Sequence, residues 1–244
     1  MPSLLRTHGR FPYSAINARP RYAWPGGKRL AVYLGLNLEH FAFGEGHGGE
    51  LAPSGRPDVL NYSWREYGNR VGAWRLLDEF EELRLPVSVL ANSEIAGHCP
   101  ELLAAHIARG DEVVGHGRTN AERQGDLVER DEAALIAETT STLADAAGAT
   151  RSWQLAETTG DCMIVDNFDE MREQSERHEQ PLVMGIALHA YIVGQPFRLR
   201  KLRRALEHIA AHRDDVWLTT SGEIAAHART ELDRFVHGGV YVSE

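Results

Sequence analysis

Residues 85–115 read LPVSVLANSEIAGHCPELLAAHIARGDEVVG and predict a strand, a helix and a second strand in close succession. The apolar run 85–93 is typical of a buried strand. Cys99-Pro100-Glu101 begins the helix, because proline is favoured in the first helical turn, and Gly110 ends it, because glycine is favoured just beyond the last helical residue. EVVG (112–115) is the second strand. Two strands joined through a helix in this way predict a parallel pair.

The same alternation continues on both sides of this unit. The apolar run LAVYLGLN (30–37) predicts a strand, and apolar residues at three-residue spacing predict a helix over 67–83. Towards the C-terminus the patterns predict helices over 130–147 and 161–177, a strand over 181–189, a helix over 198–212, a strand over 216–220 and a helix from residue 221. Five strands alternating with helices predict an α/β fold, with a parallel sheet or an α/β barrel.

One segment interrupts the alternation. Residues 149–160, ATRSWQLAETTG, carry no strand or helix pattern, although a helix precedes them and another follows. Two successive helices with no strand between them break the rhythm of an α/β chain. We therefore interpret residues 149–160 as a shortened central connection.

Charge and composition exclude several classes of function. The chain has 244 residues, and its 26 Lys and Arg against 35 Asp and Glu give a formal net charge of −9. An acidic surface repels phosphate, which argues against nucleic acid or an anionic membrane as a partner. No apolar run approaches the roughly 20 residues of a membrane-spanning helix, and the N-terminal residues lack the apolar core of a signal peptide. We expect a cytoplasmic protein that binds neither nucleic acid nor membrane.

Three predicted strands end on side chains that can carry chemistry. Glu39 follows the first strand, His116 follows the third and His189 ends the strand over 181–189. The carboxyl ends of parallel strands meet at one edge of a sheet, so these three side chains can face one cavity. One histidine at a strand end is more often a packed or surface residue, so the coincidence of three favours catalysis. A carboxylate and two imidazoles supply the base and the acid that hydrolysis of an amide needs.

Other polar residues are interpreted more conservatively. Asn37 and Asn120 are expected to form structural hydrogen bonds or to orient a water molecule. Arg65 and Glu66 could reach a substrate carbonyl or form a salt bridge within a loop, and the sequence leaves both alternatives open. Five further histidines are interpreted as surface residues: His40, His47, His98, His106 and His178.

Several longer stretches resemble one enzyme family. EVVGHGRTN (112–120), LHAYIVGQPFR (188–198) and VWLTTSGEIAAH (216–227) are similar to motifs of the polysaccharide deacetylase (NodB-homology) family. RPRYAWPGGKRLAVY (19–33) and NYSWREYGNRVG (61–72) resemble its allantoinase-like branch most closely. The resemblance covers roughly residues 10–148 and 161–228, with an apparent internal deletion around residues 149–160.

The resemblance implies a fold, an activity and a class of substrate. It implies a deformed (β/α) barrel, here incomplete because about five strands are recognised. It implies a single domain over residues 1–244, with an extended N-terminal arm over 1–29 and the shortened connection over 149–160. The implied activity is hydrolysis of a non-peptide carbon–nitrogen bond in a small amide, a cyclic ureide or an acetylated sugar of carbohydrate metabolism.

The resemblance also implies roles for individual residues. His189 matches the family's general acid, while Glu39 and His116 take the positions of the carboxylate and the first histidine that hold the metal. Asn120 falls where the second histidine is expected, and Asn37 falls where the base aspartate is expected. An amide is a poor zinc ligand and cannot act as a base. A weakly held divalent ion such as zinc, with Glu39, His116 and Asn120 as ligands, and a site without metal therefore both remain open. The candidate substrate-binding residues are Arg65, Glu66, Asn37 and Asn120.

The missing central segment supports a second hypothesis. Without the family's central strands, the sheet would have open edges that another chain could cover. On this alternative the protein is a catalytically impaired or inactive, internally deleted relative that associates through these edges. A homo-oligomer is therefore the expected assembly.

Overall fold

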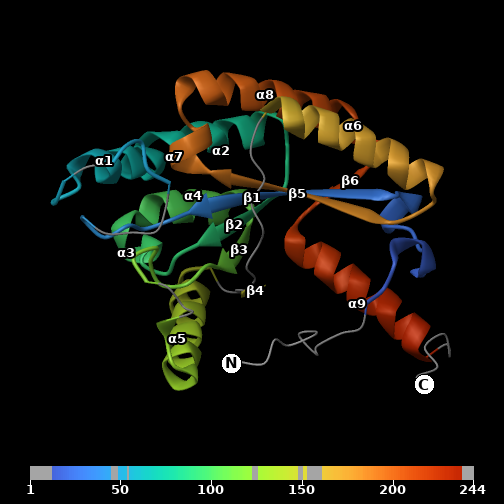
Figure 1. Cartoon of the computed structure of the whole chain (residues 1–244), viewed down its shortest axis with the longest axis horizontal. Coiled ribbons are helices and arrows are strands. Elements are labelled where there is room, and N and C mark those ends of the chain that lie inside the picture. Colours follow the sequence, from blue (N-terminus) through green and yellow to red (C-terminus); the bar gives the residue numbers. More distant parts are fainter. Residues whose placement is uncertain are drawn as a thin grey trace, which may run out of the picture.

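A computed structural model describes residues 13–44, 49–53, 55–122, 126–147, 151–152 and 161–237 (Figure 1). Of the predicted N-terminal arm, residues 1–12 lie outside these ranges, as do residues 149–150 and 153–160 of the predicted central connection. None of the helices within the described ranges is both long enough and apolar enough to cross a membrane.

The centre of the molecule is a parallel sheet. Its strands run in the order β4-β3-β2-β1-β5, and β6 also pairs with β1. All pairings are parallel. The strand bounds are β1 Leu30–Leu38, β2 Val87–Ala91, β3 Glu112–Gly115, β4 Arg151–Ser152, β5 Leu182–His189 and β6 Trp217–Thr219.

Strand β1 organises this sheet because three other strands pair with it. Strand β5 pairs along one edge of β1, from Leu30 to Asn37. Strand β6 pairs with residues 31–33 and β2 with residues 34–38, so these two share the opposite edge of β1. Asn37 thereby lies directly opposite His189, and the ends of β1 and β5 meet.

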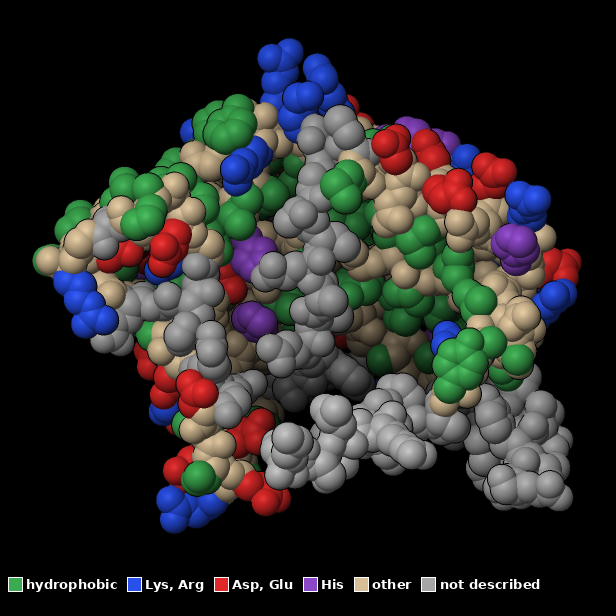
Figure 2. Space-filling view, viewed as in Figure 1, with side chains coloured by type: hydrophobic (Ala, Val, Ile, Leu, Met, Phe, Trp, Pro, Cys, Tyr) green, Lys and Arg blue, Asp and Glu red, His purple; other side chains and the backbone are tan. Residues whose placement is uncertain are grey.

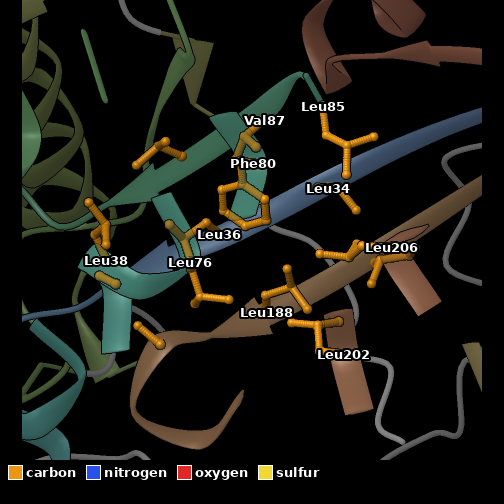
Figure 3. Close-up of a cluster of buried hydrophobic side chains, with 14 of the residues drawn as sticks. Leu34, Leu36, Leu38, Leu76, Phe80, Leu85, Val87, Leu188, Leu202 and Leu206 are labelled. Carbon is orange, nitrogen blue, oxygen red and sulfur yellow. The ribbon is translucent and has the colours of Figure 1, made fainter. Parts of the chain in front are cut away.

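Helices cover the sheet and complete its core. The helices are α1 Val59–Tyr67, α2 Ala73–Glu82, α3 Ile95–His98, α4 Pro100–Arg109, α5 Glu129–Ala147, α6 Asp161–Arg177, α7 Ala190–Val193, α8 Pro196–Ala211 and α9 Ser221–His237. Figure 3 shows Leu76 and Phe80 of α2 and Leu202 and Leu206 of α8 lying against side chains of β1 and β5. All four are at most 2% exposed, so burial of apolar surface holds both helices on the sheet.

The outer surface separates charge. Basic side chains gather over α8 and acidic side chains lie along the neighbouring helix α6 (Figure 2). The cationic residues of α8 alternate with buried leucines, which is the pattern of a helix with one face in the core and one in water.

The described part of the N-terminal arm packs where strands β5 and β6 begin, at the opposite edge of the sheet from the strand ends that carry Glu39, His116 and His189. Trp24 is 2% exposed, and its ring packs at a tilt against those of Trp217 and His227. Its indole N–H donates a hydrogen bond to the main-chain oxygen of Leu182, 2.9 Å away. The arm is therefore anchored where β5 and β6 begin.

The five predicted strands are all present, and β4 adds a two-residue strand inside the segment where the sequence predicted none. The helix expected from residue 67 begins earlier, at Val59, because Asp58 caps it by accepting a hydrogen bond from the Asn61 N–H. A π-helical turn over Gly68–Gly72 then separates α1 from α2. Both departures follow from local geometry that hydrophobic spacing does not encode.

The π-helical turn needs glycine where it meets the segment after β5. A Cβ atom on Gly68 would lie 2.6 Å from the main-chain nitrogen of Tyr191. We predict that Gly68→Ala lowers the free energy of unfolding by about 1–3 kcal/mol, because Tyr191 must shift. Gly97→Ala is the matched control, since a Cβ at Gly97 meets no atom within 4 Å. Urea denaturation checks this, and equal effects of the two substitutions would contradict it.

Candidate active site

The structure brings Glu39, His116 and His189 together at one edge of the sheet. Glu39 follows β1, His116 follows β3 and His189 ends β5. The Nε2 atoms of His116 and His189 lie 3.8 and 3.7 Å from Oε1 of Glu39. The Glu39 residue is 5% exposed, whereas 21% of the His116 side chain and 14% of the His189 side chain are exposed. Two partly accessible imidazoles thus face one buried carboxylate.

Asn120 holds this carboxylate from the side of β3. Its Nδ2 donates a hydrogen bond of 2.5 Å to Oε1 of Glu39. Oε2 of Glu39 is buried and has no hydrogen-bond partner among the described residues. A buried polar oxygen without a protein partner is energetically unfavourable, so a water molecule or a ligand would stabilise it.

The donor atoms here do not form a three-ligand metal site. Among the residues that the structure describes, no group of three His, Cys, Asp or Glu side chains could hold a metal ion. Asn120 donates from Nδ2 to Glu39, so its donor atom for an ion would be the amide oxygen, which zinc binds poorly.

An aromatic wall lies beside His189. The Tyr191 ring lies edge-on to the rings of His189, Phe41 and Trp64, with centroids 5.7, 5.7 and 4.9 Å apart. The Tyr191 hydroxyl accepts a hydrogen bond of 3.1 Å from the Gly49 N–H. Phe41 and Tyr191 each follow a candidate catalytic residue by two positions, a signal that the sequence contained and that our interpretation overlooked.

Solved structures with this arrangement of strands and helices were found by comparison. A probable polysaccharide deacetylase from Pseudomonas aeruginosa PAO1 superimposes with a TM-score of 0.74 at 23% identity, covering 91% of this chain and 99% of its own. PuuE allantoinase superimposes with a TM-score of 0.72 at 21% identity, covering 95% of this chain and 99% of its own. The chain has the polysaccharide deacetylase fold.

This finding confirms the fold that the sequence motifs implied. No family model and no curated protein matches the sequence itself. At these identities the likeness shows the polysaccharide deacetylase fold alone, so the activity must be argued from the site.

The remaining predicted substrate-binding residues occupy the surroundings of the site in this deacetylase fold. The Asn37 Nδ2 donates to the main-chain oxygen of Leu188 at 3.2 Å and so links β1 to β5. Arg65 is 4% exposed, donates to the main-chain oxygen of Gly49 and lies 4.8 Å from the centroid of the Phe41 ring. Arg65 thus packs against the aromatic wall, and a direct role in substrate binding stays a prediction for both Asn37 and Arg65.

Glu66 is the centre of a second polar cluster. Its carboxylate contacts Nε2 of His98 at 2.9 Å and Nε of Arg70 at 3.0 Å. The rings of His98 and His40 are 5.0 Å apart. Burial lowers the pKa of His40, and repulsion from His98 lowers it further. Substrate binding by Glu66 stays a prediction.

The structure corrects one interpretation of the histidines. His106, expected at the surface, is fully buried, and its Nδ1 lies 2.7 Å from Oδ2 of Asp111. It sits where α4 turns into β3, at the opposite end of β3 from His116. Helix periodicity did place it on the inner face of α4, which was the signal available. His47 lies outside the described residues.

Proposed function

We propose that this protein is a hydrolase of non-peptide carbon–nitrogen bonds in small amides, cyclic ureides or acetylated sugars. The observation that carries the proposal is the approach of two imidazoles to one buried carboxylate, at 3.7 and 3.8 Å. Strand ends of a parallel α/β sheet are where active sites of such folds form. The names of the two similar structures, a deacetylase and an allantoinase, support the same reaction class.

The three side chains divide the reaction between them. Glu39 and His116 position a water molecule, and the Glu39 carboxylate takes its proton as the oxygen attacks the carbonyl carbon of the substrate. His189 gives a proton to the nitrogen as the carbon–nitrogen bond breaks. The products are a carboxylic acid and an amine, or the opened ring of a ureide.

The transition state also needs donors for its developing oxyanion. An amide side chain carries two N–H donors, and Asn120 uses one of them on Glu39. We assign the second donor, together with main-chain N–H groups at the strand ends, to the substrate oxygen. Asn120 thereby links the base and the oxyanion.

Substrate assays on purified protein test the proposal. The panel contains acetylated sugars, small amides, allantoin and cyclic imides, each assayed with chelator-treated protein and again with added zinc. Metal content per chain is measured on protein purified without chelator or added metal. We expect turnover of at least one substrate. Failure of the whole panel under both conditions would argue against the proposed hydrolase.

A second candidate function rests on the sheet edge. Strand β5 ends the strand order among the described residues, and Val183 on it is 40% exposed. We propose that a catalytically impaired chain with this edge would associate with a second copy through β5. Light scattering of the wild-type protein should then give the molar mass of an oligomer. Val183→Lys should give that of a monomer, because a charged side chain opposes pairing of two sheet edges. A monomeric wild-type protein would contradict this association.

A further inference from the structure

Asn92, which follows β2, connects the chain segment that carries Glu39 with the one that carries His116. It is fully buried. Its Oδ1 accepts a hydrogen bond of 2.9 Å from the His40 N–H, and its Nδ2 donates one of 2.6 Å to the main-chain oxygen of His116. One side chain therefore bridges the residue after Glu39 and the main chain of His116.

The bridge lies where the regular strand pairing stops. The β1–β2 ladder ends with Leu38 opposite Ala91, and the β2–β3 ladder ends with Ala91 opposite Gly115. One more main-chain hydrogen bond follows in each ladder. The Asn92 N–H donates to the Leu38 oxygen, and the His116 N–H donates to the Ala91 oxygen. The Asn92 amide then acts in place of a peptide group and continues the pairing by one further residue on each side.

Only an amide of this length satisfies both neighbours. The partners are a main-chain N–H and a main-chain oxygen, so the bridging group must accept on one side and donate on the other. A carboxylate can only accept, and a hydroxyl places both functions on a single atom. The chemistry of the partners thus also fixes the orientation of the amide.

Two further contacts show that the main chain around Glu39 is held in the same way. Asn69, in the π-helical turn, donates from Nδ2 to the main-chain oxygen of Glu39 at 2.8 Å. The main-chain N–H of Asn120 donates to the main-chain oxygen of His40 at 2.9 Å. The peptide groups next to the Glu39 carboxylate are therefore fixed from neighbouring elements.

We propose that Asn92 is a positioning residue that sets the distance between the Glu39 carboxylate and the His116 imidazole. This inference deepens the proposed hydrolase function and rests on it. Asn92 touches neither carboxylate nor imidazole, and acts through the main chain of both strand ends. A shift of about 1 Å between reacting groups costs on the order of 100-fold in rate.

The test compares Asn92→Ala with Asn61→Ala. Asn61 is also fully buried, and its amide also bridges main-chain groups, the Leu51 N–H and the Ala52 oxygen, outside the carboxylate site. We expect Asn92→Ala to lower kcat about 100-fold with little change in KM. Asn61→Ala should lower the free energy of unfolding about as much as Asn92→Ala does, and should leave kcat unchanged.

Nuclear magnetic resonance gives a readout that does not depend on turnover. In ring nitrogen–proton correlation spectra, Asn92→Ala should shift the His116 signals and leave those of buried His106 in place. Asn61→Ala should shift neither set. If Asn92→Ala does not fold, Asn92→Asp replaces it, because the isosteric carboxylate keeps the acceptor for the His40 N–H and loses the donor to His116.

The outcomes separate this inference from the proposed function. A wild-type protein without turnover would remove the hydrolase, yet displaced His116 signals in the Asn92 variant would still support positioning. Unchanged His116 signals in a destabilised Asn92 variant would overturn the inference, even in an active enzyme. Equal displacement in the Asn61 variant would overturn it as well.

Discussion

Replacing His189 by alanine should reduce turnover by about 10²–10⁴-fold and leave the fold intact. The ring lies 3.7 Å from Glu39 and is the group assigned to protonate the leaving nitrogen. Loss of a general acid removes this proton transfer, whose contribution is about 10²–10⁴-fold. The measurement is kcat/KM on the best substrate of the panel, with circular dichroism to follow the fold.

The same substitution at His178 is the control. His178 is exposed just beyond the end of α6, before β5 begins, and so lies at the opposite end of that strand from His189. His178→Ala should retain full activity. Unchanged activity of His189→Ala would remove His189 from the reaction and with it the proposed mechanism. A leaving group that needs little protonation should suffer less from His189→Ala than a poor one, which tests the acid role itself.

Replacing Glu39 by glutamine should strongly reduce activity without destabilising the protein. The substitution removes the base, so we expect kcat/KM to fall by about 10²–10⁴-fold. The amide oxygen of glutamine can still accept the hydrogen bond from Asn120. The neutral amide is also less costly to bury than a carboxylate whose Oε2 lacks a partner in the described part of the chain.

The free energy of unfolding of Glu39→Gln should therefore equal that of the wild type or exceed it by about 1 kcal/mol. Glu179→Gln is the control, because its side chain is 63% exposed and pairs with Arg21 at the surface. Urea denaturation and kcat/KM are measured on both variants. Retained activity in Glu39→Gln would remove Glu39 from the reaction, and a loss of stability above about 2 kcal/mol would show a structural role.

Both predictions concern residues that the sequence singled out by their place at strand ends. Strand ends could be found because the elements themselves are local: apolar runs, a proline at Pro100 and a glycine at Gly110 with φ +85° mark them. The parallel direction of the strands then follows from the helices between them. For this reason the sequence alone assigns the candidate carboxylate and imidazoles to one edge of the sheet.

The parts that could not be predicted depend on which elements become neighbours. Hydrophobic spacing does not reveal that β6 and β2 share one edge of β1. It does not reveal the π-helical turn or the two-residue strand β4 either. These features arise from contacts between residues far apart in the chain, and local propensity is a weak guide to such contacts.

The sequence by itself determined the α/β class, the parallel direction and the strand ends that carry Glu39, His116 and His189. Only the tertiary structure decided that β5 pairs directly with β1, which places His189 opposite Asn37 and beside Glu39. It alone showed the Asn92 bridge and the contact of the Tyr191 ring with the His189 ring. The physical reason is that a residue type fixes what bonds a side chain can form, whereas the neighbouring strands decide which partners it meets.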